Sequence, residues 1–296
     1  MSTSVLYEAP ALPYPRLHKG KVRELFQLDD ERLLMVATDR LSAFDVVFPQ
    51  GIPAKGRVLN SLSALWFRAT VGITLNHLIT TDMTTLGLDF ETTASLQGRA
   101  AVVKRTKRID VECVVRGYLA GSGWKEYQQS GTVCGIPLPS GLKLNAKLPE
   151  PIWTPAIKND VGHDENVPEA RIRQLYGSAL TNQLKARSLA LYEFAAAQTL
   201  GAGIILADTK FEFGRLGDQL LLIDEIFTPD SSRYWPLERY VEGEPIDSLD
   251  KQPVRDYVEA IGWDKSPPAP ILPESLIEET SRRYEGVLER LNSLLA

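Results

Sequence analysis

The chain contains little cysteine and little histidine, with two and three residues respectively among 296. Cys113 and Cys134 have neither a metal-binding spacing nor the number needed for a disulfide framework. Neither cysteine has an evident histidine partner, which disfavours a covalent thiol intermediate. His163 could act as a base or a metal ligand, but without a His/Cys cluster a structural role is favoured.

The chain also lacks a long hydrophobic run. Residues 1–10 contain no secretory apolar core, and residues 186–207, the most apolar long stretch, are interrupted by Arg187, Glu193 and Gln198. That stretch is too polar to span a bilayer. We therefore expect a cytoplasmic protein that makes no membrane contact, because unpaired cysteines also suit a reducing compartment.

No charge of one sign dominates, since the formal net charge is −5 and the pI is near 5.4. This balance argues against a general nucleic-acid-binding or membrane-surface role, while leaving room for a local basic site. Hydrophobic residues make up 44% of the chain and charged residues 24%, which is typical of a globular protein with one large domain or two lobes. Whether the protein is a monomer or a homodimer does not follow from these features.

The apolar patterns predict an α+β protein. Strand-like runs occupy three segments, namely residues 33–38, 100–104 and 111–115. Helices are expected over residues 60–69, over 168–200 as one long helix or two, over 245–260 and over 274–295. Residues 82–88 are expected to form a loop. A change of pattern near Asp110 divides the chain into a β-rich lobe, residues 1–110, and a mixed α/β lobe, residues 111–296.

The most informative feature is a predicted β-hairpin formed by residues 204–214 and 220–225. Each of its two strands begins with apolar residues and ends with charged residues. Alternation along the first strand places Asp208, Lys210 and Glu212 on one face. Charged residues are rarely buried at this density without a functional role. Carboxylates can bind Mg²⁺ through their oxygens, and a neighbouring lysine can bind a phosphate. The alternative is a solvated hairpin edge with ordinary charges.

Several polar segments could bind anions. Lys21 and Arg23 follow Gly20, which would let the backbone approach a polyphosphate, although a basic surface turn is the commoner explanation. Arg116 precedes a Gly-Ser-Gly loop at Ser122, where a salt-bridged strand end is the alternative. The remaining segments are a charged turn at residues 39–45, a polar loop at 151–166 that contains Lys158, and a turn at 228–233.

Together these segments resemble the SAICAR synthetase family, also called phosphoribosylaminoimidazole-succinocarboxamide synthases. The matching blocks are GKVREL, DRLSAFD, IPAKGRVLN, ECVVRGYLAGSGWKEY, KLPEPIWTPAIKNDVGHDEN, DTKFEFG, DEIFTPDSSRYW and LDKQPVRDY. They run in family order from Gly20 to Tyr257, and the chain looks like the longer form of the family. The resemblance implies a two-lobed, kinase-like fold with a β-rich nucleotide-binding lobe.

The resemblance also implies the substrates ATP, L-aspartate and carboxyaminoimidazole ribotide (CAIR), with Mg²⁺, and the products SAICAR, ADP and phosphate. The implied nucleotide-binding residues are Gly20, Lys21, Val22, Arg23, Lys104, Glu112 and Lys158. The implied metal ligands are Glu212 and Asp224, and the implied catalytic residues are Asp208 and Lys210. The implied substrate-binding residues are Arg116, Ser122, Asp230, Ser232 and Arg233, together with Asp39, Ser42, Asp45 and Lys55 at the aspartate end.

A carboxylate is a poor electrophile, so the expected route is phosphorylation of CAIR to an acyl phosphate, followed by attack of the aspartate amine. The acceptor of the amine proton is left open between Asp208 and phosphate. The hairpin register, which decides whether Asp224 shares a face with Glu212, is also open. The rival functions are a small-molecule kinase of the same fold and an inactive nucleotide-binding module.

Overall fold

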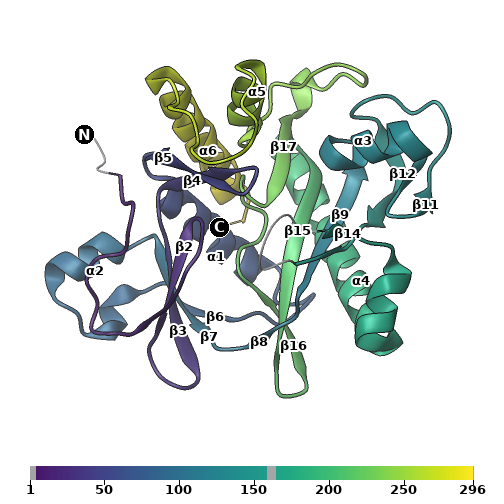
Figure 1. The fold of residues 1–296 in the computed structure, drawn as a ribbon. Helices are drawn as coiled ribbons and strands as arrows, with labels where there is room; N and C mark the ends of the chain where they lie inside the picture. Colours follow the sequence, from purple (N-terminus) through teal and green to yellow (C-terminus); the bar gives the residue numbers. More distant parts are fainter. Residues whose placement is uncertain (1–4, 159–164, 296) are drawn as a thin grey trace. The chain divides into compact units, whose positions relative to one another are not determined.

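The computed structural model describes residues 5–158 and 165–295 (Figure 1). The chain divides into two compact units. Unit 1 comprises Met1–Ala69, Asn76–Lys107 and Asp250–Ala296, and unit 2 comprises Thr70–Leu75 and Arg108–Leu249. The chain passes from unit 1 to unit 2 at Lys107–Arg108, close to the boundary expected at Asp110. Two continuous lobes are not observed, because Thr70–Leu75 belongs to unit 2 and Asp250–Ala296 to unit 1.

Unit 1 contains a five-stranded antiparallel sheet in the order β1-β2-β3-β7-β6. Its strands are β1 (Arg16–Lys19), β2 (Arg23–Gln27), β3 (Arg32–Ala37), β7 (Ala100–Lys104) and β6 (Leu78–Thr80). A separate pair, β4 (Arg40–Ala43) and β5 (Val46–Gly51), forms a hairpin. The predicted strands at 33–38 and 100–104 are thus confirmed, and they pair directly with each other.

The helices of unit 1 are α1 (Lys55–Ala69), the 3₁₀ helix η1 (Met83–Leu86), α2 (Phe90–Leu96), α5 (Gln252–Ala260) and α6 (Glu274–Leu295). Helix α6 has the predicted bounds, whereas α5 begins seven residues later than expected and η1 lies within the predicted loop. Buried Val254, Val258 and Leu272 pack with Leu41 and Phe48 of the β4–β5 hairpin. This apolar cluster explains why the C-terminal segment belongs to unit 1.

Unit 2 is built on a sheet with the main order β14-β13-β9-β15-β16. Its strands are β8 (Lys107–Arg108), β9 (Val111–Tyr118), β12 (Lys147–Trp153), β13 (Ala156–Ile157), β14 (Glu165–Asn166), β15 (Ile204–Leu216), β16 (Gln219–Ile223) and β17 (Ser232–Pro236). Strands β10 (Thr132–Val133) and β11 (Ile136–Pro137) form a small hairpin. The predicted β15–β16 hairpin is confirmed, and β15 also pairs with β9 and β17.

Helix α4 (Glu169–Gly201) contacts β9 and β15, and α3 (Gly121–Ser130) follows β9 (Figure 1). Gly177, with φ 79° and ψ 161°, divides α4, so the expectation of one long helix or two resolves to two joined helices. Ser188 of α4 opposes the rise in the pKa of the Cys113 thiol that burial causes, and Cys113 pairs with Phe211 in the β9–β15 register. This face of the β9–β15 pair is therefore covered by α4, which leaves the alternate residues on the opposite face.

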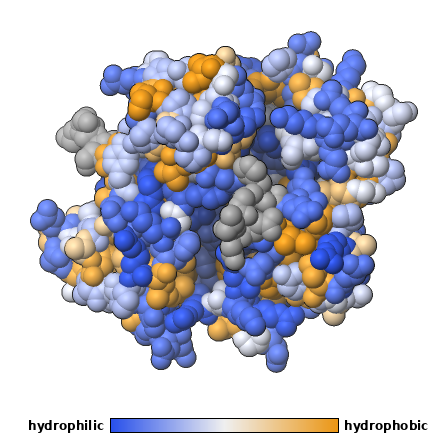
Figure 2. Space-filling view, viewed as in Figure 1, coloured by the Kyte–Doolittle hydropathy of each residue, from blue (hydrophilic) through white to orange (hydrophobic). Residues whose placement is uncertain are grey.

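Among the described residues, no helix has the length and apolar character needed to cross a membrane. Hydrophilic side chains predominate on the face drawn in Figure 2, where apolar residues form small separate areas.

Candidate functional site

One face of the unit 2 sheet carries a row of charged residues, which we call the charged face: Glu112 and Arg116 of β9 with Asp208, Lys210 and Glu212 of β15. The antiparallel register pairs Asp208 with Arg116 and Lys210 with Val114. Because side chains alternate along each strand, all five residues project away from α4. The sequence prediction that Asp208, Lys210 and Glu212 share a face is consistent with this register.

Two arginines meet at Asp208. Arg116 Nη1 donates to Asp208 Oδ2 at 3.3 Å, and Arg233 Nη1 donates to the same oxygen. Arg116 also donates from Nε to Thr154 Oγ1 at 3.0 Å and from Nη2 to Ser122 Oγ at 3.1 Å. Burial lowers the pKa of Arg116, and the Asp208 carboxylate opposes that shift. Two clustered guanidiniums with a single carboxylate form a cationic pair that suits a phosphate.

The Gly-Ser-Gly segment expected as a loop forms the first turn of α3, and its glycines allow these arginines to come close to the backbone. A Cβ atom on Gly121 would overlap the Arg233 guanidinium, and Gly121 has φ 55°. A Cβ on Gly123 would lie 3.2 Å from Arg116 Cδ. The Gly-Ser-Gly sequence is therefore explained by close packing around both guanidiniums, with Ser122 as a direct hydrogen-bond partner.

Lys210 lies between two acidic groups on the charged face. Its Nζ donates to Glu112 Oε1 at 2.8 Å. Burial alone would lower the pKa of Lys210, but Glu112, and then Glu212 and Glu225, raise it overall. Lys210 is therefore a cation at neutral pH, which suits electrostatic work and not proton acceptance.

A second acidic group lies at the other end of the charged face. Glu212 pairs with Ile223 in the β15–β16 register, and Lys158 Nζ donates to Glu212 Oε1. Asp224 follows β16 with φ 68°, and this left-handed conformation interrupts the strand alternation that would otherwise send its side chain to the α4 side. Burial raises the pKa of Glu212, and repulsion by Asp224 raises it further. Because Ile223 pairs with Glu212, a regular strand would place Asp224 on the opposite face, and the left-handed backbone of Asp224 removes that restriction.

The loop before β2 in unit 1 carries the other predicted nucleotide-binding residues. Lys21 Nζ donates to Asp45 Oδ1, and Asp45 lies at the tip of the β4–β5 hairpin with φ 64°. Gly20 N donates to Arg23 O at 2.8 Å, so Val22 lies within a tight turn. Lys104 ends β7 in the same unit, where its amide donates to His77 O at 2.7 Å.

Two predicted substrate contacts need correction. Asp39 is fully buried within unit 1, where its carboxylate accepts hydrogen bonds from Leu6 N, Gly56 N and Arg99 Nη1 at 2.7–3.0 Å. These donors occupy both oxygens, so Asp39 is a structural residue. Ser232 Oγ lies 2.8 Å from Thr209 Oγ1, on the face opposite Asp208, so its hydroxyl does not reach the charged face.

Other predicted residues are not brought to the charged face by any described contact. Lys55 and Ser42 are buried, at 0% and 7% exposure, and the Ser42 carbonyl accepts a hydrogen bond from Lys251. Asp230 lies in the turn before β17, where its amide donates to Thr228 Oγ1 at 3.3 Å. Their roles remain predictions. His163 lies outside the described residues.

Two residues of unit 2 were missed by the sequence analysis. Thr154 holds Arg116 through its hydroxyl, and it is fully buried. Glu225 accepts a hydrogen bond from Thr228 Oγ1 at 2.7 Å and contributes to the raised pKa of Lys210. The charged end of the 220–225 run was a usable signal for Glu225, whereas nothing in the sequence around Thr154 distinguishes it from a core threonine.

Comparison with known proteins decides the family. The profile of the SAICAR synthetase family matches residues 16–270. The chain belongs to the SAICAR synthetase family. The phosphoribosylaminoimidazole-succinocarboxamide synthase of Leptospira interrogans (serogroup Icterohaemorrhagiae serovar copenhageni, strain Fiocruz L1-130) is 51% identical over 270 residues, which cover 91% of this chain and 94% of the relative.

Two solved structures support the same assignment. SAICAR-synthase from Saccharomyces cerevisiae complexed with SAICAR has a TM-score of 0.86 and 37% identity, covering 95% of each chain. A type-2 SAICAR synthetase in complex with ADP has a TM-score of 0.69 and 25% identity, covering 93% of this chain and 97% of that one. As a SAICAR synthetase, the protein is an ATP-dependent ligase of purine biosynthesis with the expected α+β fold, and the kinase alternative is not favoured.

Proposed function

We propose that the charged face of unit 2 binds CAIR at its arginine end and brings the CAIR carboxylate to its Lys210–Glu212 end for phosphorylation. The observation that carries this proposal is the order of charge along β15. With a rise of about 3.3 Å per residue, the Asp208 and Glu212 backbones lie ~13 Å apart. That separation suits a ribotide, whose phosphate and reacting carboxylate are at opposite ends.

The arginine end would bind the ribotide phosphate. Arg116 and Arg233 are oriented by Asp208, and Ser122 adds a hydroxyl beside Arg116. Since these groups are held in place before a ligand arrives, little ordering is needed on binding. Binding at this end would supply orientation to the reaction at the other end.

The carboxylate pair Glu212 and Asp224 fits Mg²⁺. Burial, and then repulsion by Asp224, raise the pKa of Glu212, and a divalent cation would offset that repulsion. Mg²⁺ commonly binds one or two protein carboxylates together with phosphates and water, so two carboxylates suffice. When bound, Mg²⁺ would offset charge on the transferring phosphoryl group.

The cations near this pair would position ATP and CAIR. Lys158, now paired with Glu212, can contact a phosphate oxygen, and Lys210 can offset charge that develops on the CAIR carboxylate. In unit 1, Lys21 and the backbone of the Gly20–Val22 loop would bind ATP phosphates. Lys104 and Glu112 are proposed to line the nucleoside, as expected from the sequence.

The proposed reaction has two steps. The CAIR carboxylate takes the γ-phosphoryl group of ATP, releasing ADP and giving an acyl phosphate. The aspartate amine then attacks the acyl carbon and phosphate leaves. A thiol intermediate is disfavoured because burial raises the pKa of Cys113 to about 12, which keeps it protonated. The cytoplasmic location and the residues that bind L-aspartate stay predictions.

The test is an assay of ADP formation by the purified protein, omitting one substrate at a time. We expect full turnover only with ATP, CAIR, L-aspartate and Mg²⁺ together, and SAICAR as the product. Stoichiometric formation of a stable phosphorylated product without aspartate would instead indicate a kinase.

A further inference from the structure

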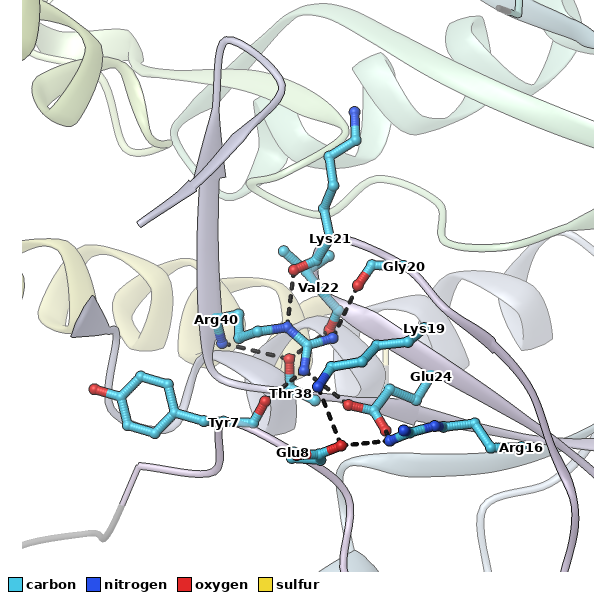
Figure 3. Close-up of polar contacts among 10 residues, drawn as sticks. All are labelled: Tyr7, Glu8, Arg16, Lys19, Gly20, Lys21, Val22, Glu24, Thr38 and Arg40. Atoms are coloured by element: carbon cyan, nitrogen blue, oxygen red, sulfur yellow. Dashed lines mark hydrogen bonds and ion pairs between the residues drawn. The ribbon is translucent and has the colours of Figure 1, made fainter. Parts of the chain in front are cut away.

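Arg40 is buried at the start of β4, at 7% exposure, and its guanidinium donates to the loop that precedes β2 (Figure 3). Nη2 donates to Gly20 O at 2.9 Å, and Nε donates to Lys21 O at 2.9 Å. Thr38, two residues earlier and fully buried, donates from Oγ1 to Val22 O at 2.8 Å and from its amide to the same oxygen at 2.9 Å. Three consecutive carbonyls of the loop are thus turned inward.

The inward carbonyls fix the direction of the amides. In a trans peptide the N–H points opposite to the C=O, so the amides of Lys21 and Val22 point away from Arg40. Neither amide donates a hydrogen bond among the described residues 5–158 and 165–295. Successive outward amides in a turn can bind an anion together, and Lys21, whose Nζ donates to Asp45 Oδ1, adds a positive charge beside them. The loop is therefore shaped to bind phosphate oxygens.

The anchor is rigid because the other atoms of Arg40 are also bound. Nη1 donates to Glu24 Oε1 at 2.7 Å and to Tyr7 O, and Glu24 is fully buried. An arginine is required here, because its planar fork presents donors in several fixed directions, whereas a lysine is a single point donor on a flexible chain.

We propose that Arg40, assisted by Thr38, is a positioning residue that holds the Gly20–Val22 loop in the conformation that binds the phosphates of ATP. This inference rests on the nucleotide-binding role proposed above for the loop. Arg40 itself would not touch ATP, because all its bonds are directed into unit 1.

The experiment compares Arg40→Lys with Arg16→Lys. Arg16 Nη1 donates to the other oxygen of the same Glu24 at 3.2 Å, but no described hydrogen bond joins Arg16 to a carbonyl of the loop. The control therefore makes the same chemical change beside the same carboxylate. The KM values for ATP and for CAIR, kcat and the thermal midpoint are measured for both variants. Hydrogen exchange without ligand is followed at Gly20 and Thr38, whose amides bond to Arg23 and Val22 carbonyls.

For Arg40→Lys we expect KM for ATP to rise roughly tenfold, the effect of losing one good hydrogen bond, while KM for CAIR changes less than about twofold. Exchange at Gly20 and Thr38 should accelerate. Arg16→Lys should change none of these. Equal changes in KM for ATP and CAIR, or an unchanged KM for ATP in a folded variant, would overturn the proposal.

Thr38→Val keeps the shape of the side chain and removes one of the same anchors, so it provides a second test if Arg40→Lys does not fold. We expect the same selective rise in KM for ATP, but a smaller one. An unchanged KM for ATP in Thr38→Val would then count against the inference. Failure of the wild-type protein to bind ATP would contradict the proposed function itself, which separates the two ideas.

Discussion

Arg116 Nη1 lies 3.3 Å from Asp208 Oδ2, and both side chains are less than a tenth exposed. Removing one partner of a buried ion pair leaves the other charge without compensation. We expect Asp208→Asn to lower the free energy of unfolding by about 3 kcal/mol. Urea unfolding of the ligand-free protein measures this change.

The control for Asp208→Asn is Asp247→Asn. Asp247 forms an exposed ion pair with Arg239 at 2.8 Å. A solvated pair of this kind contributes less than ~1 kcal/mol, so the control should have almost wild-type stability. Similar losses in the two variants would argue against a special role for burial at Asp208.

Arg233 provides the cleaner test of phosphate binding, because its side chain is 19% exposed and Arg116 is more deeply buried. We expect Arg233→Ala to weaken CAIR binding by about 1.5–3 kcal/mol and ATP binding much less. Gly121→Ala should act in the same direction, since its new methyl group would displace the Arg233 guanidinium. Calorimetric titration with each ligand checks both variants, and Arg239→Ala is the control; equal losses for CAIR and ATP would exclude a substrate-specific role.

The metal assignment is tested by Glu212→Gln and Asp224→Asn. Each change removes a ligand charge and keeps the shape of the side chain, and asparagine tolerates the left-handed conformation at position 224. We expect both variants to lose turnover while remaining folded. Asp218→Asn, in the exposed turn of the same hairpin, should be fully active. Normal ADP release by either variant at ordinary Mg²⁺ concentration would rule out the assignment.

The pKa of Glu212 also predicts a pH dependence of stability. Burial and Asp224 raise this pKa above its ordinary value of 4.5. Between 4.5 and the raised pKa, the folded protein binds more protons than the unfolded protein, so the free energy of unfolding falls as the pH rises through that interval. Glu212→Gln should lack this contribution, and Mg²⁺ should stabilise the wild-type protein more at the upper end of the interval.

Glu169 provides a control of opposite sign. Burial would raise its pKa, but hydrogen bonds from Lys185 and Arg173 lower it overall. Its contribution to stability is therefore present above pH 4.5 and is lost as the pH falls through the lowered pKa. The difference between Glu169→Gln and wild type should change with pH in the direction opposite to that for Glu212→Gln, as measured by urea unfolding across the acidic range.

Local pattern was enough to predict the β15–β16 hairpin and helix α6, because alternation and helical periodicity are properties of neighbouring residues. The position of the C-terminal segment was not predictable in this way. In the sequence, Val254 and Val258 are only apolar positions of a predicted helix. No pattern in the neighbouring residues indicates that they pack with Leu41 and Phe48, some two hundred residues away.

The candidate site shows the same limit. Motif resemblance identified Asp39 and Ser232 as substrate contacts. The Asp39 carboxylate instead accepts hydrogen bonds from residues distant in the sequence, such as Arg99. The strand register places the Ser232 hydroxyl beside Thr209, on the face opposite Asp208. A register shift between Leu206 and Asp208 sets which residues of β17 face which side. Likewise, family resemblance paired Asp224 with Glu212, but strand alternation alone would place Asp224 on the opposite face, and the left-handed backbone that breaks this alternation is not visible in the sequence pattern.

The proposed acyl phosphate makes a prediction about oxygen. Direct attack of an amine on an unactivated carboxylate lacks a leaving group, and the buried Cys113 thiol is unsuited to form a covalent intermediate. If the carboxylate takes the phosphoryl group, one carboxylate oxygen must leave with the phosphate. We expect CAIR labelled with ¹⁸O in its carboxylate to give phosphate that carries one labelled oxygen, as measured by mass spectrometry. A reaction with unlabelled CAIR in ¹⁸O water controls for exchange from solvent. Formation of SAICAR with unlabelled phosphate from labelled CAIR would falsify the route.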